Sequence, residues 1–115
     1  MNIDKNYLRE NLRDDMINLG FDGDSIDVGI EALVESFEDS FPSLNEAIQS
    51  KNLEAIRFHA HALKGTFANF ENSEFNDLAS FFKEIEFAVK ERKDFSEIEE
   101  SFKKVNNSIK NWVQF

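Results

Sequence analysis

The stretch Leu53–Phe70 reads LEAIRFHAHALKGTFANF, and its apolar residues recur at intervals of three and four. This spacing is typical of a helix with one buried face, because successive residues lie about 100° apart around a helix axis. One sector about 100° wide contains Leu53, Ile56, Ala60, Leu63, Phe67 and Phe70. We therefore expect a helix whose inner face contributes to a hydrophobic core.

Helical spacing continues on both sides of this segment. Few residues alternate between polar and apolar, and only one Pro and four Gly occur, so the predicted fold class is all-α. We expect an antiparallel four-helix bundle over residues 25–113, with a short additional N-terminal helix in residues 1–22. Pro42 is expected to interrupt or kink the first bundle helix. Ser96 and Glu99 predict a capping box at the start of the last helix, which should continue to Val113.

Composition restricts the kinds of function. The 115 residues fit a single domain, 1–115, and 23 acidic against 13 basic residues give a formal net charge of −10. This charge makes nucleic acid and membrane surfaces poor partners. The absence of Cys excludes disulfides, thiolate nucleophiles and Cys-ligated zinc. Without a long apolar run or signal peptide, the chain is expected to be cytoplasmic.

The outer face of the Leu53–Phe70 helix is unusually small and apolar. It carries Phe58, His61, Ala62, Gly65 and Ala68, with Glu54, Lys64 and Asn69 at its flanks. Gly in a helix interior costs about 1 kcal/mol relative to Ala, and small neighbours leave an imidazole open to another protein. A neutral imidazole is a nucleophile near neutral pH. Lys64, three residues after His61, can reach the same ring.

The segment Ala60-His61-Ala62-Leu63-Lys64-Gly65 resembles the signature Ala-His-x-Leu-Lys-Gly of histidine-containing phosphotransfer (HPt) domains, which act in the phosphorelays of two-component signalling. The similarity extends over about residues 25 to 113 and includes the mid-helix proline and the later LASFFKEIE. Members fold as a four-helix bundle with an exposed histidine on a central helix. The resemblance therefore implies the same architecture as the spacing of apolar residues.

By this resemblance, His61 is the residue phosphorylated, on its Nε2 atom. Lys64 would assist the phosphoryl oxygens, and Gly65 would keep the approach open. The partner would be a receiver domain of a response regulator or a hybrid sensor histidine kinase, whose aspartate, Mg²⁺ and lysine supply most of the catalytic apparatus. The chain itself would be a carrier without metal or cofactor, not an enzyme. The docking surface would comprise Phe58, Ala62, Ala68 and Asn69.

Two alternatives to a stand-alone carrier remain. One is the phospho-accepting domain of a chemotaxis-type kinase, although no glycine-rich nucleotide-binding motif occurs and the chain has its own Met1 without a linker at either end. The other is a non-phosphorylated adaptor that inhibits a receiver or kinase, against which the intact His61 and Lys64 argue. Because carrier action needs a free histidine face, we expect a monomer.

Other polar residues receive simpler interpretations. His59 points about 200° away from His61 around the helix, so the two cannot share a metal, and His59 should pack at the core boundary. The pairs Asp14–Asp15, Glu84 with Glu86, and Glu99–Glu100 are interpreted as solvated helix faces or caps. Glu71 stands where many HPt domains have Gly, and Asn72 is expected to end the helix in its place.

Overall fold

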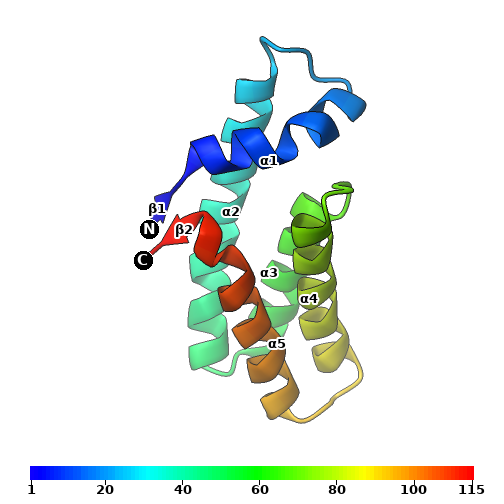
Figure 1. Cartoon of the computed structure of the whole chain (residues 1–115). Coiled ribbons are helices and arrows are strands. Elements are labelled where there is room, and N and C mark those ends of the chain that lie inside the picture. The colour runs from blue at the N-terminus through cyan, green and yellow to red at the C-terminus, as the bar shows by residue number, and fades with distance from the viewer.

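The computed structural model describes residues 1–115 as five helices, a short 3-10 turn and a two-stranded ribbon (Figure 1). The elements in chain order are β1 (Asn2–Ile3), α1 (Lys5–Asn18), α2 (Ile26–Gln49), α3 (Leu53–Phe67), α4 (Ser73–Lys90), α5 (Phe95–Ser108), the 3-10 turn η1 (Ile109–Asn111) and β2 (Val113–Gln114).

Helices α2 to α5 form an up-and-down bundle, and α1 lies across the end of α2 that is uppermost in Figure 1. Helix α3 packs between α2 and α4, and α5 packs against α4. Short connections make consecutive helices antiparallel, because a loop of a few residues can only reverse the chain. The predicted all-α bundle with an additional N-terminal helix is confirmed. None of these helices has both the length and the apolar character needed to cross a lipid bilayer.

An aromatic cluster lies at the centre of the bundle. The Phe67 ring of α3 has its centroid 6.2 Å from that of Phe37 and 6.1 Å from each of Phe75, Phe82 and Trp112. All five side chains are fully buried and belong to one core of 29 buried residues. Because each aromatic ring buries a large apolar area, about 150–250 Å², this cluster fixes how α3 is rotated in the bundle.

The last predicted helix ends earlier than expected. Helix α5 stops at Ser108, and residues Val113–Gln114 form β2, which pairs antiparallel with β1. The Asp4 amide also donates to the Trp112 carbonyl at 2.8 Å, so the two ends of the chain lie side by side (Figure 1). Pairing of the two ends satisfies backbone groups that a longer helix would have satisfied internally.

Two local predictions about helix ends and interiors need correction. Pro42 does not interrupt α2, which continues through it; Pro42 is exposed, while Phe41 and Leu44 on the same helix are buried. No capping box forms at Ser96, because α5 begins at Phe95, with Asp94 as N-cap. The Glu97 amide bonds the Asp94 carbonyl at 2.9 Å instead.

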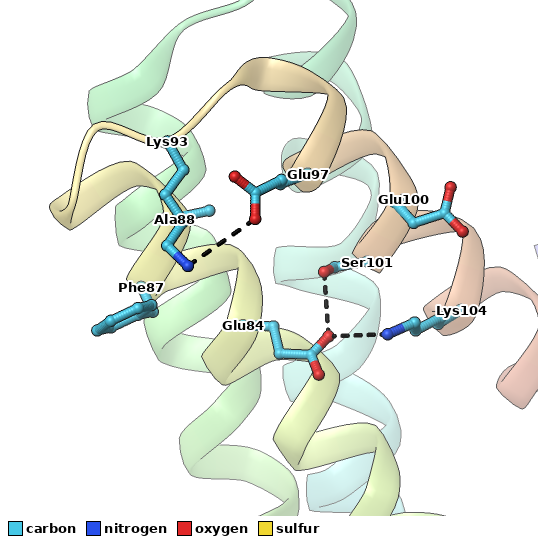
Figure 2. Close-up of a pocket in the computed structure, with 8 residues that line it drawn as sticks. All are labelled: Glu84, Phe87, Ala88, Lys93, Glu97, Glu100, Ser101 and Lys104. Carbon is cyan, nitrogen blue, oxygen red and sulfur yellow. Dashed lines mark hydrogen bonds and ion pairs between the residues drawn. The ribbon is translucent and has the colours of Figure 1, made fainter.

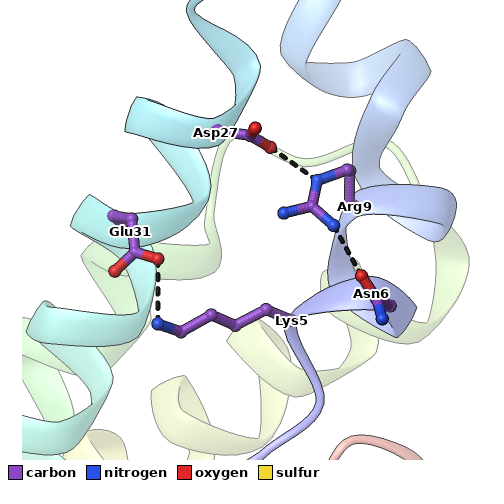
Figure 3. A network of polar contacts seen from close by, with 5 residues as sticks. All are labelled: Lys5, Asn6, Arg9, Asp27 and Glu31. Atoms are coloured by element: carbon purple, nitrogen blue, oxygen red, sulfur yellow. Dashed lines mark hydrogen bonds and ion pairs between the residues drawn. The ribbon is translucent and has the colours of Figure 1, made fainter.

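Polar contacts attach α1 to the bundle (Figure 3). Lys5 pairs with Glu31 at 2.8 Å and Arg9 pairs with Asp27, both on α2. These pairs are exposed, and exposed ion pairs contribute only about 0–1 kcal/mol each. The buried side chains of α1, Leu8, Leu12 and Met16, therefore hold it more firmly than its charges.

The connection between α3 and α4 is anchored by α1, which corrects two expectations. Asp15 is buried, not solvated, and its carboxylate accepts the Asn72 amide at 3.0 Å. Asn72 does not end α3, which stops at Phe67; it caps α4 by accepting the Glu74 amide at 3.0 Å. Tyr7 donates to Glu74 at 2.7 Å, and burial together with this carboxylate raises the pKa of Tyr7 to about 12.

Candidate functional site

The orientation of α3 decides which side chains reach solvent. Asn52 starts the helix by accepting the Ala55 amide at 3.2 Å. Four inner side chains are completely buried: Ile56, Ala60, Leu63 and Phe67. Leu53, expected in this stripe, is instead half exposed at the end of the bundle. With the inner face fixed, the opposite face of α3 must point outward.

His61 lies on this outer face, with 69% of its side chain exposed. Its Nδ1 atom is 2.9 Å from Oε2 of Glu86, which comes from α4. The same carboxylate receives Lys64, whose Nζ lies 3.3 Å from Oε2 and 3.4 Å from Oε1. Glu86 thus links His61 to Lys64. The sequence predicted that Lys64 lies near His61, but it did not predict the carboxylate between them.

The electrostatics of Glu86 determine the tautomer of His61. Burial of the carboxyl group raises its pKa, but the hydrogen bonds from His61 and Lys64, with the Lys64 charge, outweigh burial and leave the pKa below 4.5. At neutral pH the group is therefore an ionised carboxylate, which can only accept hydrogen bonds. It follows that Nδ1 of His61 carries the hydrogen. In the neutral ring, Nε2 then carries the lone pair, and no protein atom hydrogen-bonds it.

The surface around His61 is shallow and open. A hollow of about 450 Å³ is lined by Glu54, Arg57, Phe58, His61, Ala62 and Glu86. Phe58 is 69% exposed, and a methyl group added at Gly65 would meet no atom within 4 Å. Ala62, Ala68 and Asn69 are also exposed. The residues expected to form a docking surface are thus accessible together with His61.

Glu86 is the residue that sequence reasoning missed, because it was interpreted as part of a solvated face. The sequence does carry one signal of its position. Glu86 directly follows buried Ile85 and comes four residues after buried Phe82, which places it at the edge of the apolar stripe of α4. A carboxylate at that edge can reach the neighbouring helix, where a histidine is a suitable hydrogen-bond partner.

His59 occupies a different environment from His61. It is partly buried, its Nδ1 is buried without a hydrogen-bond partner, and its ring meets Phe58 edge-on with centroids 5.1 Å apart. No group of three or more His, Asp or Glu side chains is arranged to hold a metal ion. His59 is therefore a boundary residue, and the exposed imidazole with a free ring nitrogen is that of His61.

The exposed ring nitrogen of His61 lies on an open, shallow surface, which we interpret as accessible to another protein. Comparison with known proteins bears on this interpretation. Neither a curated protein nor a solved structure matched the chain. A family profile for the Hpt domain matches residues 29–112, which include α3 and α4 with His61, Lys64 and Glu86. The chain therefore belongs to the Hpt domain family, the histidine phosphotransfer carriers of phosphorelay signalling.

Proposed function

We propose that this chain accepts a phosphoryl group on Nε2 of His61 from the aspartate of a receiver domain and passes it to another receiver. The observation that carries the proposal is the 2.9 Å contact between Nδ1 of His61 and the Glu86 carboxylate. This contact keeps the hydrogen on Nδ1 and leaves the exposed Nε2 as the nucleophile. A phosphorelay carrier needs this combination of exposure and fixed tautomer.

In the proposed step, the Nε2 lone pair attacks the phosphorus of the aspartyl phosphate. The N–P bond forms as the P–O bond to the aspartate breaks, and the aspartate leaves as a carboxylate. The ring gains positive character while its hydrogen remains on Nδ1, and the Glu86 carboxylate stabilises that charge. Transfer onward is the same step in reverse, with a second aspartate as the nucleophile.

The surroundings of His61 support docking of a receiver. Ala62, Gly65 and Ala68 let a partner approach the backbone of α3, and Phe58 and Asn69 supply contacts at the rim. The receiver contributes Mg²⁺, so this chain needs no metal or cofactor of its own. The donor is a hybrid sensor histidine kinase or a response regulator. We place the carrier in the cytoplasm as a monomer, because docking requires the outer face of α3 to be uncovered.

The test compares two histidines that lie two residues apart. Wild type, His61→Gln and His59→Gln are each incubated with a phosphorylated receiver domain and Mg²⁺, and intact mass is followed with an acid-lability check. We expect an acid-labile adduct on wild type and on His59→Gln, and none on His61→Gln. Circular dichroism of each variant controls for folding.

The contrary outcome is also informative. An adduct that survives in His61→Gln would place the phosphoryl group elsewhere. If a receiver binds the folded wild type but leaves no adduct, the chain is a non-phosphorylated adaptor, and the proposal is wrong.

A further inference from the structure

Resting on the proposed function, a second inference concerns the cation that meets the phosphoryl group. We propose that the guanidinium of Arg57 binds the phosphoryl oxygens on His61, and that Lys64 serves mainly to hold Glu86. Both residues flank His61 on α3, Arg57 four residues before it and Lys64 three residues after it. The structure gives the two cations different surroundings.

Lys64 is already occupied in the unphosphorylated site. Its ammonium is 3.3 Å from Glu86 Oε2, and both side chains are largely covered, with 27% of Lys64 and 20% of Glu86 exposed. Moving Lys64 to a phosphoryl group would remove a partner from a largely covered carboxylate, which carries a desolvation cost. Lys64 is also absent from the residues that line the hollow around His61.

Arg57 is uncommitted. It is exposed, it lines the same hollow as His61, and no carboxylate lies within ion-pair distance of its guanidinium. Residues four apart on a helix are separated by about 40° around the axis and about 6 Å along it. Helical side chains also lean toward the N-terminus, so the imidazole of His61 leans over the turn that carries Arg57.

The guanidinium of Arg57 is chemically better suited to bind a phosphoryl group than the ammonium group of a lysine is. A guanidinium is planar, always charged, and donates two parallel hydrogen bonds to phosphate oxygens. Arg57 loses no protein partner when it does so. It also offsets the repulsion that Glu54, another residue of the hollow, would exert on an incoming anion.

The experiment loads the carrier without a partner protein. In a His59→Gln background, phosphoramidate phosphorylates His61: Nε2 attacks phosphorus, the P–N bond of the reagent breaks, and ammonia leaves. Arg57→Ala, Arg57→Lys and Lys64→Ala are compared with Arg13→Ala, which removes an exposed and unpaired arginine of α1. The readouts are the rate of adduct formation, its dependence on salt, and the His61 tautomer seen in imidazole ¹⁵N shifts.

We expect adduct formation about tenfold slower in Arg57→Ala, with weaker salt dependence, because one charge-assisted contact is lost. Arg57→Lys should recover part of the rate, and Arg13→Ala should match the parent. The His61 tautomer should be unchanged in Arg57→Ala and redistributed in Lys64→Ala.

The inference is overturned if Arg57→Ala reacts like Arg13→Ala, or if Lys64→Ala slows the reaction more than Arg57→Ala while leaving the tautomer unchanged. Its failure is distinguishable from failure of the proposed function. Receiver-dependent labelling of His61 without an Arg57 effect overturns this inference only. Absence of labelling by any receiver overturns the proposed function, and the phosphoramidate rates still decide the role of Arg57.

Discussion

Two glutamates on α4, Glu84 and Glu86, each bridge to a neighbouring helix through the same pattern of partners. Glu84 accepts the Ser101 hydroxyl at 3.0 Å and lies 3.5 Å from Lys104, both on α5 (Figure 2). Glu86 meets His61 and Lys64 on α3. In both bridges the lysine follows the uncharged partner by three residues, which places the two on one face of a helix.

The two bridges differ in which member is exposed. On the α5 side, Ser101 is 8% exposed and the charged ends of Glu84 and Lys104 face solvent. On the α3 side, Glu86 and Lys64 are largely covered, whereas the His61 side chain is exposed to solvent. A buried hydroxyl with a solvated ion pair fastens two helices, whereas a covered ion pair beneath an exposed imidazole holds that ring in one orientation. Exposure, more than the pattern of partners, therefore distinguishes the Glu86 bridge from the Glu84 bridge.

The largest effect on stability should come from removing a side chain of the hydrophobic core that positions the helices of both bridges. Phe67→Ala deletes a fully buried ring that contacts five other aromatic side chains, and such deletions cost about 3–5 kcal/mol. Urea denaturation should show a loss of about 4 kcal/mol in the free energy of unfolding. A loss under about 1 kcal/mol would mean that the α3 orientation does not depend on this cluster.

The next prediction separates the two bridges directly. Glu86→Gln replaces the carboxylate that fixes the His61 tautomer, so transfer from a phosphorylated receiver should slow about thirtyfold, a change of about 2 kcal/mol in the barrier. Glu84→Gln is the matched control on the same helix and should stay within about twofold of wild type. Single-turnover transfer rates provide the measurement. Equal slowing in the two variants would remove the distinction between the bridges.

The difference between the bridges also shows where sequence reasoning ends. Periodicity placed the start of α3 at Leu53, where the structure has it, and placed an additional helix within residues 1–22, where α1 spans Lys5–Asn18. Glu84 and Glu86 gave identical local patterns of a charged helix face. Their partners depend on how α4 is rotated and shifted against α3 and α5, which side-chain packing across the bundle decides.

The same limit explains the wrong helix ends. Ser96 and Glu99 match the sequence pattern of a capping box, yet no capping box forms and α5 begins at Phe95. The end of α5 is likewise set by the pairing of β1 with β2, two segments at opposite ends of the chain. The exposed histidine face was predictable because it lies within one helix. The carboxylate that completes it was not, since it belongs to another.

A smaller effect should appear in the dependence of stability on pH. The pKa of Glu86 is lower in the folded protein than the ordinary 4.5, since its hydrogen bonds and the Lys64 charge outweigh burial. The associated stabilisation is therefore present above pH 4.5 and is lost as the pH falls through the folded pKa. We expect the free energy of unfolding of the wild type to exceed that of Glu86→Gln by about 1 kcal/mol at neutral pH.

Urea denaturation of both proteins from about pH 7 to about pH 3 measures this difference. It should shrink as the solution becomes more acidic. A difference that stays constant or grows toward low pH would contradict the assigned direction of the pKa shift.

The smallest expected change in stability has the opposite sign and separates stability from function on α3. Gly65→Ala should stabilise the protein by about 0.5–1 kcal/mol, because Ala is the better helix former and its methyl group would meet no atom of this chain. The same methyl group stands on the face that a partner must approach, so transfer from the receiver should slow while the reaction with phosphoramidate stays unchanged. A small reagent needs no broad contact surface, whereas a receiver domain does. Thermal melts and the two transfer rates test the three expectations together. If Gly65→Ala is more stable and still transfers at the wild-type rate from every receiver tried, the glycine is not needed for an open approach, and the docking surface must lie on another side of His61.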